Sequence, residues 1–430
     1  MPNSTLDTQH SRLQGGLAPY LEVFRSGRIA AVCLLGFASG LPLALTAGTL
    51  QAWLAVEAVD IKTIGLFTLV GQPYTYKFLW APLMDRYTPP FLGRRRGWLV
   101  VTQVALLGAI ALMGTLSPRE SPWALALIAL LVAFLSASQD IVFDAYRTDV
   151  LKEHERGAGA AISVLGYRIA MLVSGALALV LADQILGWHG MYFLMAALML
   201  VGMVTSWFAP EPENPGRAPE TLTAAFAGPL KEFFGRNGAW LVLLLIVLYK
   251  LGDAFAGSLT TAFLIQGLGF TATDVGAINK ALGLAATITG ALMGGAWMAG
   301  LGLYRALLIF GVLQAVTNLG FMALALAGKS YPLMVAAVAA ENLCGGMGTA
   351  AFVALLMSQC DHRFTATQYA LLSALAAVGR VYVGPAAGYM VAAIGWAPFF
   401  FVTFLIALPG VFLLWWMRAQ LEATPAPARA

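Results

Sequence analysis

Long apolar stretches alternate with short polar segments along almost the whole of this 430-residue chain. A helix needs about 20 predominantly apolar residues to cross a bilayer, so each stretch of that length predicts a membrane-spanning helix. The stretches are residues 29–52, 61–83, 97–116, 122–144, 158–182, 189–208, 238–262, 272–298, 303–327, 331–357, 365–390 and 396–417. The pattern therefore predicts an all-α polytopic membrane protein with 12 transmembrane helices.

The longest polar interruption, residues 209–237, divides the predicted helices into two groups of six. It begins proline-rich and continues into an amphipathic segment around Leu222–Phe234, which is typical of a tether lying along a membrane surface. Two six-helix halves joined in this way resemble the major facilitator fold, in which the halves rock about a central cavity. The predicted organisation is a cytoplasmic N-terminal segment at 1–28, one half at 29–208, the linker at 209–237, the other half at 238–417 and a cytoplasmic tail at 418–430.

Composition and charge support this interpretation. The chain is 60% hydrophobic and 11% charged, with a mean hydropathy of +0.78, which excludes a soluble domain. Of the Lys and Arg residues in the loops, the terminal segments and the ends of the predicted helices, 17 fall on the side of the N-terminus, and only Lys62, Arg119 and Lys329 fall on the other side. Because basic residues are retained in the cytoplasm, both termini are predicted to be cytoplasmic. The net charge of +4 is then a topology signal, and no nucleic-acid partner is expected.

Among the ionisable side chains within the predicted helices, we single out eight, which include both signs. A charge at that depth is costly, and it persists when it is paired or faces a water-filled cavity. These side chains therefore favour a transporter over a purely structural membrane protein. They are Asp140, Asp144, Arg168, Lys250, Asp253, Lys280, Glu341 and Arg380.

The densest group in the first half is the segment SASQDIVFDAYRTDV, residues 136–150. Asp140 and Asp144 are four residues apart and share a helix face. Two neighbouring carboxylates repel unless one takes a proton or a cation approaches, so they are candidates for proton coupling. Arg168 is a candidate for that cation. The alternative for Asp144 is a structural clamp with Arg147, one turn further along.

In the second half, Lys250 and Asp253 are three residues apart on one predicted helix, and Lys280 lies in the next. Lys250 and Asp253 could serve the pathway, or they could simply neutralise each other. Glu341, which precedes Asn342, has no partner within its own helix. We therefore expect it to meet a cation from elsewhere or to carry a proton.

These residues make up the predicted site. Helices one, four, seven and ten line the cavity in the major facilitator fold, and groups of this kind fit a large polar ligand. The predicted substrate-binding residues are Gln51, Tyr74, Gln139, Asp140, Arg168, Tyr249, Lys250, Lys280, Glu341, Asn342 and Arg380. The candidates for the proton carrier are Asp140, Asp144, Asp253 and Glu341.

The segment APLMDRYTPPFLGRRRG, residues 81–97, follows the second predicted helix. It resembles the major facilitator signature between helices two and three, with TPPFL inserted between its two parts. Asp85 could accept hydrogen bonds from a helix N-terminus or an Arg and so hold the cytoplasmic side shut. The predicted cytoplasmic gate is Asp85, Arg86 and Arg147, whereas Arg94, Arg95 and Arg96 satisfy a plain positive-inside anchor.

Several runs, among them YKFLWAPLMDRY, SQDIVFDAYRTDVL and ENLCGGMGTAAFVALLM, together resemble the AmpG-type muropeptide permeases of Gram-negative bacteria over residues 29–417. The resemblance implies proton-driven import of anhydro-muropeptides, with or without a stem peptide, across the inner membrane for cell-wall recycling. It also implies a part in β-lactamase induction where that circuit exists. No cofactor is expected, and the family expectation is a monomer within the lipid bilayer.

Other functions stay open at this point. The run SQDIVFDAY also resembles acetyl-coenzyme A transporters, which keeps a second substrate class in play. A membrane enzyme would need catalytic groups in a water-facing loop, but the loops are short and the four His residues are scattered. Three cysteines, Cys33, Cys344 and Cys360, are far apart and form no metal spacing or disulfide framework.

Overall fold

The computed structural model describes residues 26–152, 155–211, 232–236, 238–360 and 365–418. This part of the chain is almost entirely helical, and it contains no strand. Most of the predicted N-terminal segment, linker and C-terminal tail lies outside the described residues.

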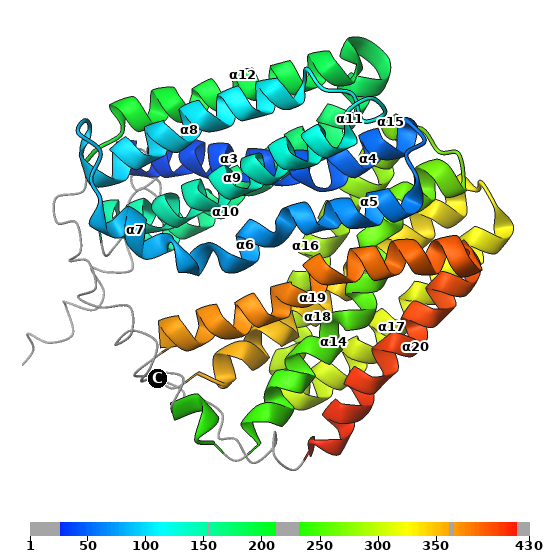
Figure 1. Ribbon diagram of the computed structural model, residues 1–430. Coiled ribbons are helices and arrows are strands. Elements are labelled where there is room, and N and C mark those ends of the chain that lie inside the picture. The colour runs from blue at the N-terminus through cyan, green and yellow to red at the C-terminus, as the bar shows by residue number, and fades with distance from the viewer. Residues whose placement is uncertain (1–25, 153–154, 212–231, 237, 361–364, 419–430) are drawn as a thin grey trace, which may run out of the picture.

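The helices of the first half follow the predicted stretches closely (Figure 1). Short 3-10 and π segments, labelled η, interrupt several of them. In order they are α3 (Gly27–Thr46), α4 (Gly48–Val56), α5 (Ile61–Phe67), η1 (Thr68–Gly71), α6 (Gln72–Tyr76), η2 (Lys77–Leu79), α7 (Ala81–Arg86), α8 (Gly93–Met113), α9 (Pro122–Val150), α10 (Arg156–Met171), η4 (Leu172–Leu177), α11 (Ala178–Leu181), η5 (Ala182–Leu186) and α12 (Gly187–Phe208).

The second half contains longer uninterrupted helices. They are α14 (Ala239–Ala262), η6 (Phe263–Gly267), α15 (Ala272–Asp274), η7 (Val275–Leu282), α16 (Gly283–Leu301), α17 (Leu303–Ala327), α18 (Tyr331–Ser358), α19 (Thr365–Ile394) and α20 (Trp396–Trp416).

Ten helices within the described residues are long and apolar enough to cross a membrane, against the 12 predicted. One of the ten, Gly159–Phe208, is 50 residues long and covers two predicted stretches. The chain reverses within it at Gly187, where φ is +65°. The predicted helix at 61–83 is not among the ten because it is broken into the short pieces α5 to α7. Pro73 and Pro82 lie in these pieces, and proline cannot donate the helical hydrogen bond.

Two ends of the molecule differ in how the halves pack. At one end a single hydrophobic core joins both halves, with Trp53 and Ile64 from the first and Phe263 and Phe400 from the second. We call this the junction end; it contains α4, α5 and α15 (Figure 1).

At the opposite end each half has its own core. One core includes Ile29 and Phe143, and the other includes Tyr249 and Phe352. Arg28, at the start of α3, and Arg95, at the start of α8, lie here, so we call it the basic end.

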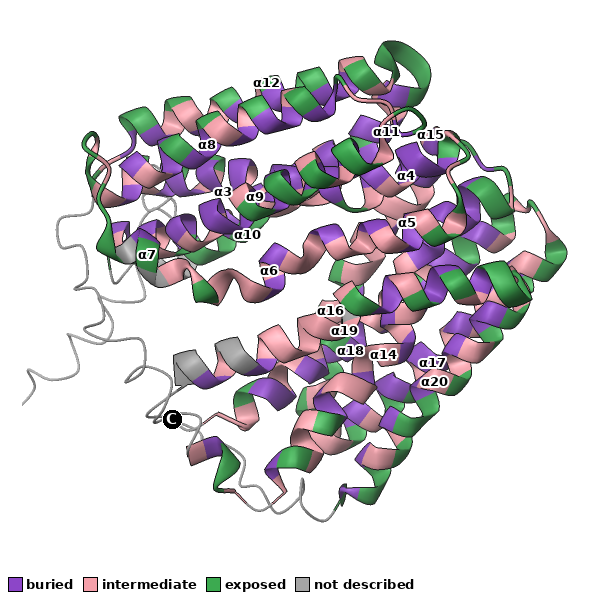
Figure 2. Cartoon of the chain, in the orientation of Figure 1, coloured by how far each residue is buried: buried purple, intermediate pink, exposed green. Residues whose placement is uncertain are grey.

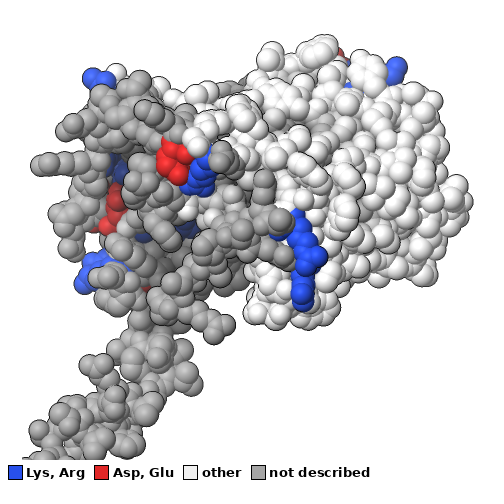
Figure 3. Space-filling model, turned by 90° about the horizontal axis from the view of Figure 1, so that it is seen from below, with Lys and Arg blue, Asp and Glu red and all other residues white. Residues whose placement is uncertain are grey.

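The outward faces of the helices are apolar. Trp123, Phe208 and Leu292 are exposed, and the exposed positions in Figure 2 run along the outer faces of helices such as α8 and α12. In Figure 3 most of the charged side chains that are drawn lie in the left and central parts of the view, and the broad surface on the right is almost entirely uncharged. This distribution is that of a multi-pass membrane protein.

Candidate functional site

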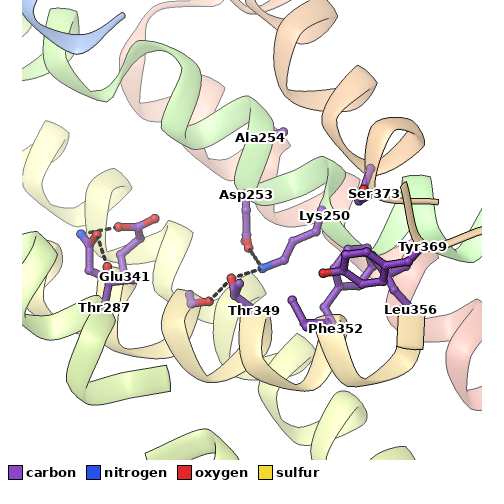
Figure 4. A pocket seen from close by; sticks show the side chains of 14 residues that line it. Lys250, Asp253, Ala254, Thr287, Glu341, Thr349, Phe352, Leu356, Tyr369 and Ser373 are labelled. Atoms are coloured by element: carbon purple, nitrogen blue, oxygen red, sulfur yellow. Dashed lines mark hydrogen bonds and ion pairs between the residues drawn. The ribbon is translucent and has the colours of Figure 1, made fainter. Parts of the chain in front are cut away.

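A pocket of about 330 Å³ lies in the second half among α14, α16, α18 and α19 (Figure 4). Its lining includes three of the predicted ionisable residues, Lys250, Asp253 and Glu341. We call it the charged pocket. The wall toward the basic end is formed by Phe352, Leu356 and Tyr369.

Lys250 is the centre of a hydrogen-bond network in this pocket. Its Nζ donates to Asp253 Oδ2 at 3.3 Å and to Gln314 Oε1 at 3.1 Å. A third bond, of 3.3 Å, reaches Thr349 Oγ1 on α18, as Figure 4 shows. The self-neutralising Lys250–Asp253 pair considered from the sequence is therefore present, and both of its members still line the pocket.

Glu341 lies in the same pocket within a second polar chain. Asn342 Nδ2 donates to Glu341 Oε2 at 2.7 Å, and Thr287 Oγ1 of α16 donates to Asn342 Oδ1 at 3.0 Å. Glu341 also interacts electrostatically with Lys250, Asp253 and Lys280. Lys250 of α14 and Lys280 of η7 are thus the cations whose charges act on Glu341, which is one of the two alternatives that the sequence analysis left open.

A larger pocket of about 530 Å³ lies nearer the junction end and is lined by both halves. We call it the neutral pocket, because its described lining side chains are uncharged apart from Lys280. Lys280 Nζ donates to Thr261 Oγ1 at 2.9 Å. A Cβ atom on Gly48 would lie 2.8 Å from Lys280 Nζ, so this glycine lets the lysine of one half approach the other half. Gln51, also in the lining, donates from Nε2 to the Ser258 carbonyl across the halves at 2.6 Å.

Asp140 lies in the first half on α9, on the side that faces α3. Ser39 Oγ donates a hydrogen bond to its Oδ1. The cation whose charge acts on Asp140 is Lys77 of η2, whereas the sequence analysis expected Arg168. The difference arises because the broken helix brings Lys77 to face α9. Lys77 lies within the predicted helix at 61–83, so its charge could have identified it from the sequence as a candidate cation for Asp140.

Buried polar atoms near Asp140 lack partners among the described residues. They include both amide atoms of Gln139 and the hydroxyls of Ser136 and Tyr74. Tyr74 also lines the neutral pocket. Buried groups of this kind are normally satisfied by protein, water or ligand, so the region is suited to receive polar groups.

Four of the predicted substrate-binding residues line neither pocket: Gln139, Asp140, Arg168 and Tyr249. Arg168 Nη1 donates to Met171 Sδ at 3.7 Å, one turn along its own helix. Tyr249 is buried, its ring stacks on Phe352 and its hydroxyl donates to the Leu307 carbonyl at 2.9 Å. Tyr249 therefore packs toward α17 and α18, a placement that the sequence periodicity did not distinguish from a pathway position.

The predicted gate at the basic end is described in part. Arg147 Nη2 pairs with Asp144 Oδ1 at 3.1 Å, and its Nη1 donates to Ser163 Oγ at 3.0 Å. This is the clamp that the sequence analysis left open. Arg86 is exposed at the end of α7. The side chains of Asp85 and of Arg380, a predicted substrate residue, lie outside the described set.

Polar contacts between the halves occur at the junction end. Gln266 Nε2 donates to the Ala55 and Val59 carbonyls at 3.2 and 2.9 Å. Thr273, in α15, donates from both its backbone N–H and its hydroxyl to Asp183 of η5. These bonds hold the halves together beyond the neutral pocket, so a ligand could pass this end only after they break.

Comparison with known proteins places the chain among transporters. Residues 32–328 match the family model of the Major Facilitator Superfamily. The anhydromuropeptide permease of Escherichia coli K12 is 62% identical over 94% of this chain and 82% of its own length. A putative AmpG transporter of Rickettsia conorii is 32% identical over 93% of this chain and 99% of its own. In fold, the chain is similar to a bacterial homologue of the human lysosomal transporter Spinster, with a TM-score of 0.70, 16% identity and coverage of 94% and 99% of the two chains.

Proposed function

This chain belongs to the AmpG-type muropeptide permeases of the major facilitator superfamily, and from that membership we propose that it imports anhydro-muropeptides by proton symport. The family makes it a transporter rather than an enzyme. The substrate is the disaccharide N-acetylglucosaminyl-1,6-anhydro-N-acetylmuramic acid, with or without its stem peptide. The observation that carries the proposal is the 62% identity to an anhydromuropeptide permease over 94% of the chain.

The two pockets support a ligand of this class. Their volumes, about 330 and 530 Å³, lie in the range of roughly 300–1,000 Å³ that small-molecule sites occupy. Lys250 and Lys280 offer cations to the carboxylates of the substrate. The neutral hydroxyls and amides between them suit the hydroxyls and acetamido groups of sugars.

Proton coupling is proposed for the carboxylates within the helices. Asp140, Asp253 and Glu341 each lie beside a cation whose attraction would change with the charge of the carboxylate. Protonation of one of them would remove its attraction to that cation, which for Asp253 is the ion pair with Lys250, and would change the balance between conformations. For Asp144 we propose a structural role, because its partner Arg147 lies one turn away at the surface.

The proposed location is the bacterial inner membrane, with both termini in the cytoplasm. The basic end then faces the cytoplasm and the junction end faces the periplasm. Because the halves share their core and polar contacts at the junction end, this structure corresponds to an inward-facing state. We propose that the protein works as a monomer, with one cavity per chain, and that it supports β-lactamase induction in organisms that have that circuit.

Uptake into proteoliposomes tests the function. Labelled disaccharide and disaccharide-peptide are supplied outside, with and without an inward proton gradient. Accumulation of intact substrate only with the gradient is the expected result. Equilibration that ignores the gradient would overturn proton symport, and absence of uptake for both compounds would overturn the substrate class. Vesicles with protein but dissipated gradient, and vesicles without protein, are the controls.

A further inference from the structure

The two pockets lie in line along the same two helices. Ala254 lines the charged pocket, and Gly257 and Ser258, one helical turn further along α14, line the neutral pocket. On α19, Ala376 lines the charged pocket and the next residue, Ala377, lines the neutral pocket. One helical turn is about 5.4 Å, so the pockets are neighbouring compartments of one elongated site.

The chemistry of the two compartments differs. The charged pocket presents an ammonium and two carboxylates, from Lys250, Asp253 and Glu341. A ligand that carries both carboxylates and an amine complements such a lining, since each of its charges can find an opposite partner. A neutral sugar offers hydrogen bonds but no opposite charge to offset the desolvation of these three charges.

The neutral pocket presents aromatic rings, hydroxyls and amides. Tyr74, Tyr167 and Phe67 supply flat apolar faces, and Tyr74 and Thr75 have buried hydroxyls that lack partners among the described residues. Sugar rings have apolar C–H faces and many hydroxyls. They would cover the aromatic rings and satisfy the open hydrogen-bonding groups.

We propose that the neutral pocket binds the disaccharide and the charged pocket binds the stem peptide, so that the ligand lies along α14 with its peptide toward the basic end. This assignment rests on the proposed function. Lys280 marks the boundary, because it lines the neutral pocket and interacts electrostatically with Glu341 of the charged pocket. The lactyl group, where sugar and peptide join, would lie beside Lys280, as a free carboxylate in the bare disaccharide and as an amide in the peptide-bearing form.

Thr349→Val and Tyr74→Phe separate the compartments. Thr349→Val removes a hydroxyl that contacts Lys250 and keeps the side-chain shape. We expect it to lower uptake of disaccharide-peptide about tenfold more than uptake of bare disaccharide, the size expected for a hydrogen bond to a charged group. Tyr74→Phe removes a hydroxyl without a described partner, and it should lower both uptakes by the same factor because both ligands carry the sugars.

The measurement is uptake of the two labelled compounds side by side, normalised to the amount of inserted protein. Equal losses for both compounds with Thr349→Val, or a selective loss of the peptide form with Tyr74→Phe, would overturn the assignment while leaving transport itself intact. Tyr369→Leu, at the other wall of the charged pocket, replaces Thr349→Val if that variant fails to insert. Wild-type protein that takes up neither compound would instead overturn the proposed function.

Discussion

The two halves satisfy their buried polar groups in different ways. In the second half, Lys250 bonds to three side chains from three helices, and Glu341 is joined to Asn342 and Thr287. In the first half, Gln139, Ser136 and Tyr74 retain buried atoms without partners among the described residues.

The two halves therefore contribute to ligand binding in different ways. A satisfied charge network is rigid and presents its groups in fixed positions before the ligand arrives. Unsatisfied groups gain their hydrogen bonds only when water or ligand enters. We therefore interpret the second half as the preorganised part of the site and the first half as the part that the ligand completes.

The largest expected effect comes from breaking the charge network. Lys250→Ala removes three hydrogen bonds and leaves Asp253 without its cation. Removing one partner of a buried ion pair costs about 3–5 kcal/mol of interaction free energy. We therefore expect uptake of disaccharide-peptide to fall at least 100-fold. Uptake is measured per inserted protein in membrane vesicles.

A double variant separates loss of function from loss of fold. Lys250→Met with Asp253→Asn removes both charges and should restore the yield of inserted protein, yet uptake should stay low. Near-normal uptake by Lys250→Ala would show that the network is not the preorganised site.

The next effect is expected from an indirect change behind Lys250. A Cβ atom on Gly348 would lie 1.4 Å from Gln314 Nε2, so Gly348→Ala must displace Gln314. Gln314 would then lose its bond to Lys250, and we expect uptake to fall about tenfold, mainly through KM, because the lysine is no longer held toward the ligand.

Gly345→Ala is the matched control for this displacement. It lies one turn earlier on α18 and also lines the charged pocket, but a Cβ atom there would meet nothing within 4 Å. A similar loss in both variants would assign the effect to the helix or to the pocket wall rather than to Gln314. Gln314→Glu should keep uptake high, because a carboxylate can also accept from Lys250.

Sequence patterning predicted most of this architecture. For α17 and α18 the predicted ranges, 303–327 and 331–357, agree with the observed helices to within one residue. Long apolar runs have one solution in a bilayer, so their positions follow from composition alone. The helix at 61–83 failed as a continuous span because its prolines and glycines break it, which an apolar count ignores.

The candidate site could be predicted in its charges and in a few neutral residues such as Gln51 and Asn342, but not in the pairings between them. Ionisable residues in spans are rare, so Lys250 and Glu341 could be identified from the sequence alone. Gln314, which accepts from Lys250, and Thr287, which bonds to Asn342 beside Glu341, could not be identified, because these pairings depend on how separate helices pack. The cation beside Asp140 was missed for the same reason, since Lys77 reaches α9 only through the broken second helix.

Two buried glutamines, one in each half, test the contrast between the halves through the thermal stability of their variants. Gln139 and Gln314 are both buried, but Gln314 bonds to Lys250 and to the Cys344 carbonyl, whereas neither amide atom of Gln139 has a described partner. Gln314→Leu should destabilise the protein by about 1–3 kcal/mol, and Gln139→Leu should be neutral or stabilising. Thermal unfolding in detergent measures both. Equal destabilisation would show that water already satisfies the first half, and the contrast between the halves would disappear.

The smallest effect is expected at the Asp144–Arg147 pair. The Asp144 side chain is 54% exposed, and exposed ion pairs contribute about 0–1 kcal/mol, so Asp144→Asn should change uptake by less than about twofold. Asp140→Asn, four residues earlier, keeps an oxygen that can accept from Ser39 but removes the negative charge on which Lys77 acts, and it should impair gradient-driven accumulation. Uptake against the gradient at several pH values compares the two variants. Loss of accumulation with Asp144→Asn would make the surface pair part of the coupling, and the first half would then contribute charge as well as open hydrogen-bonding groups.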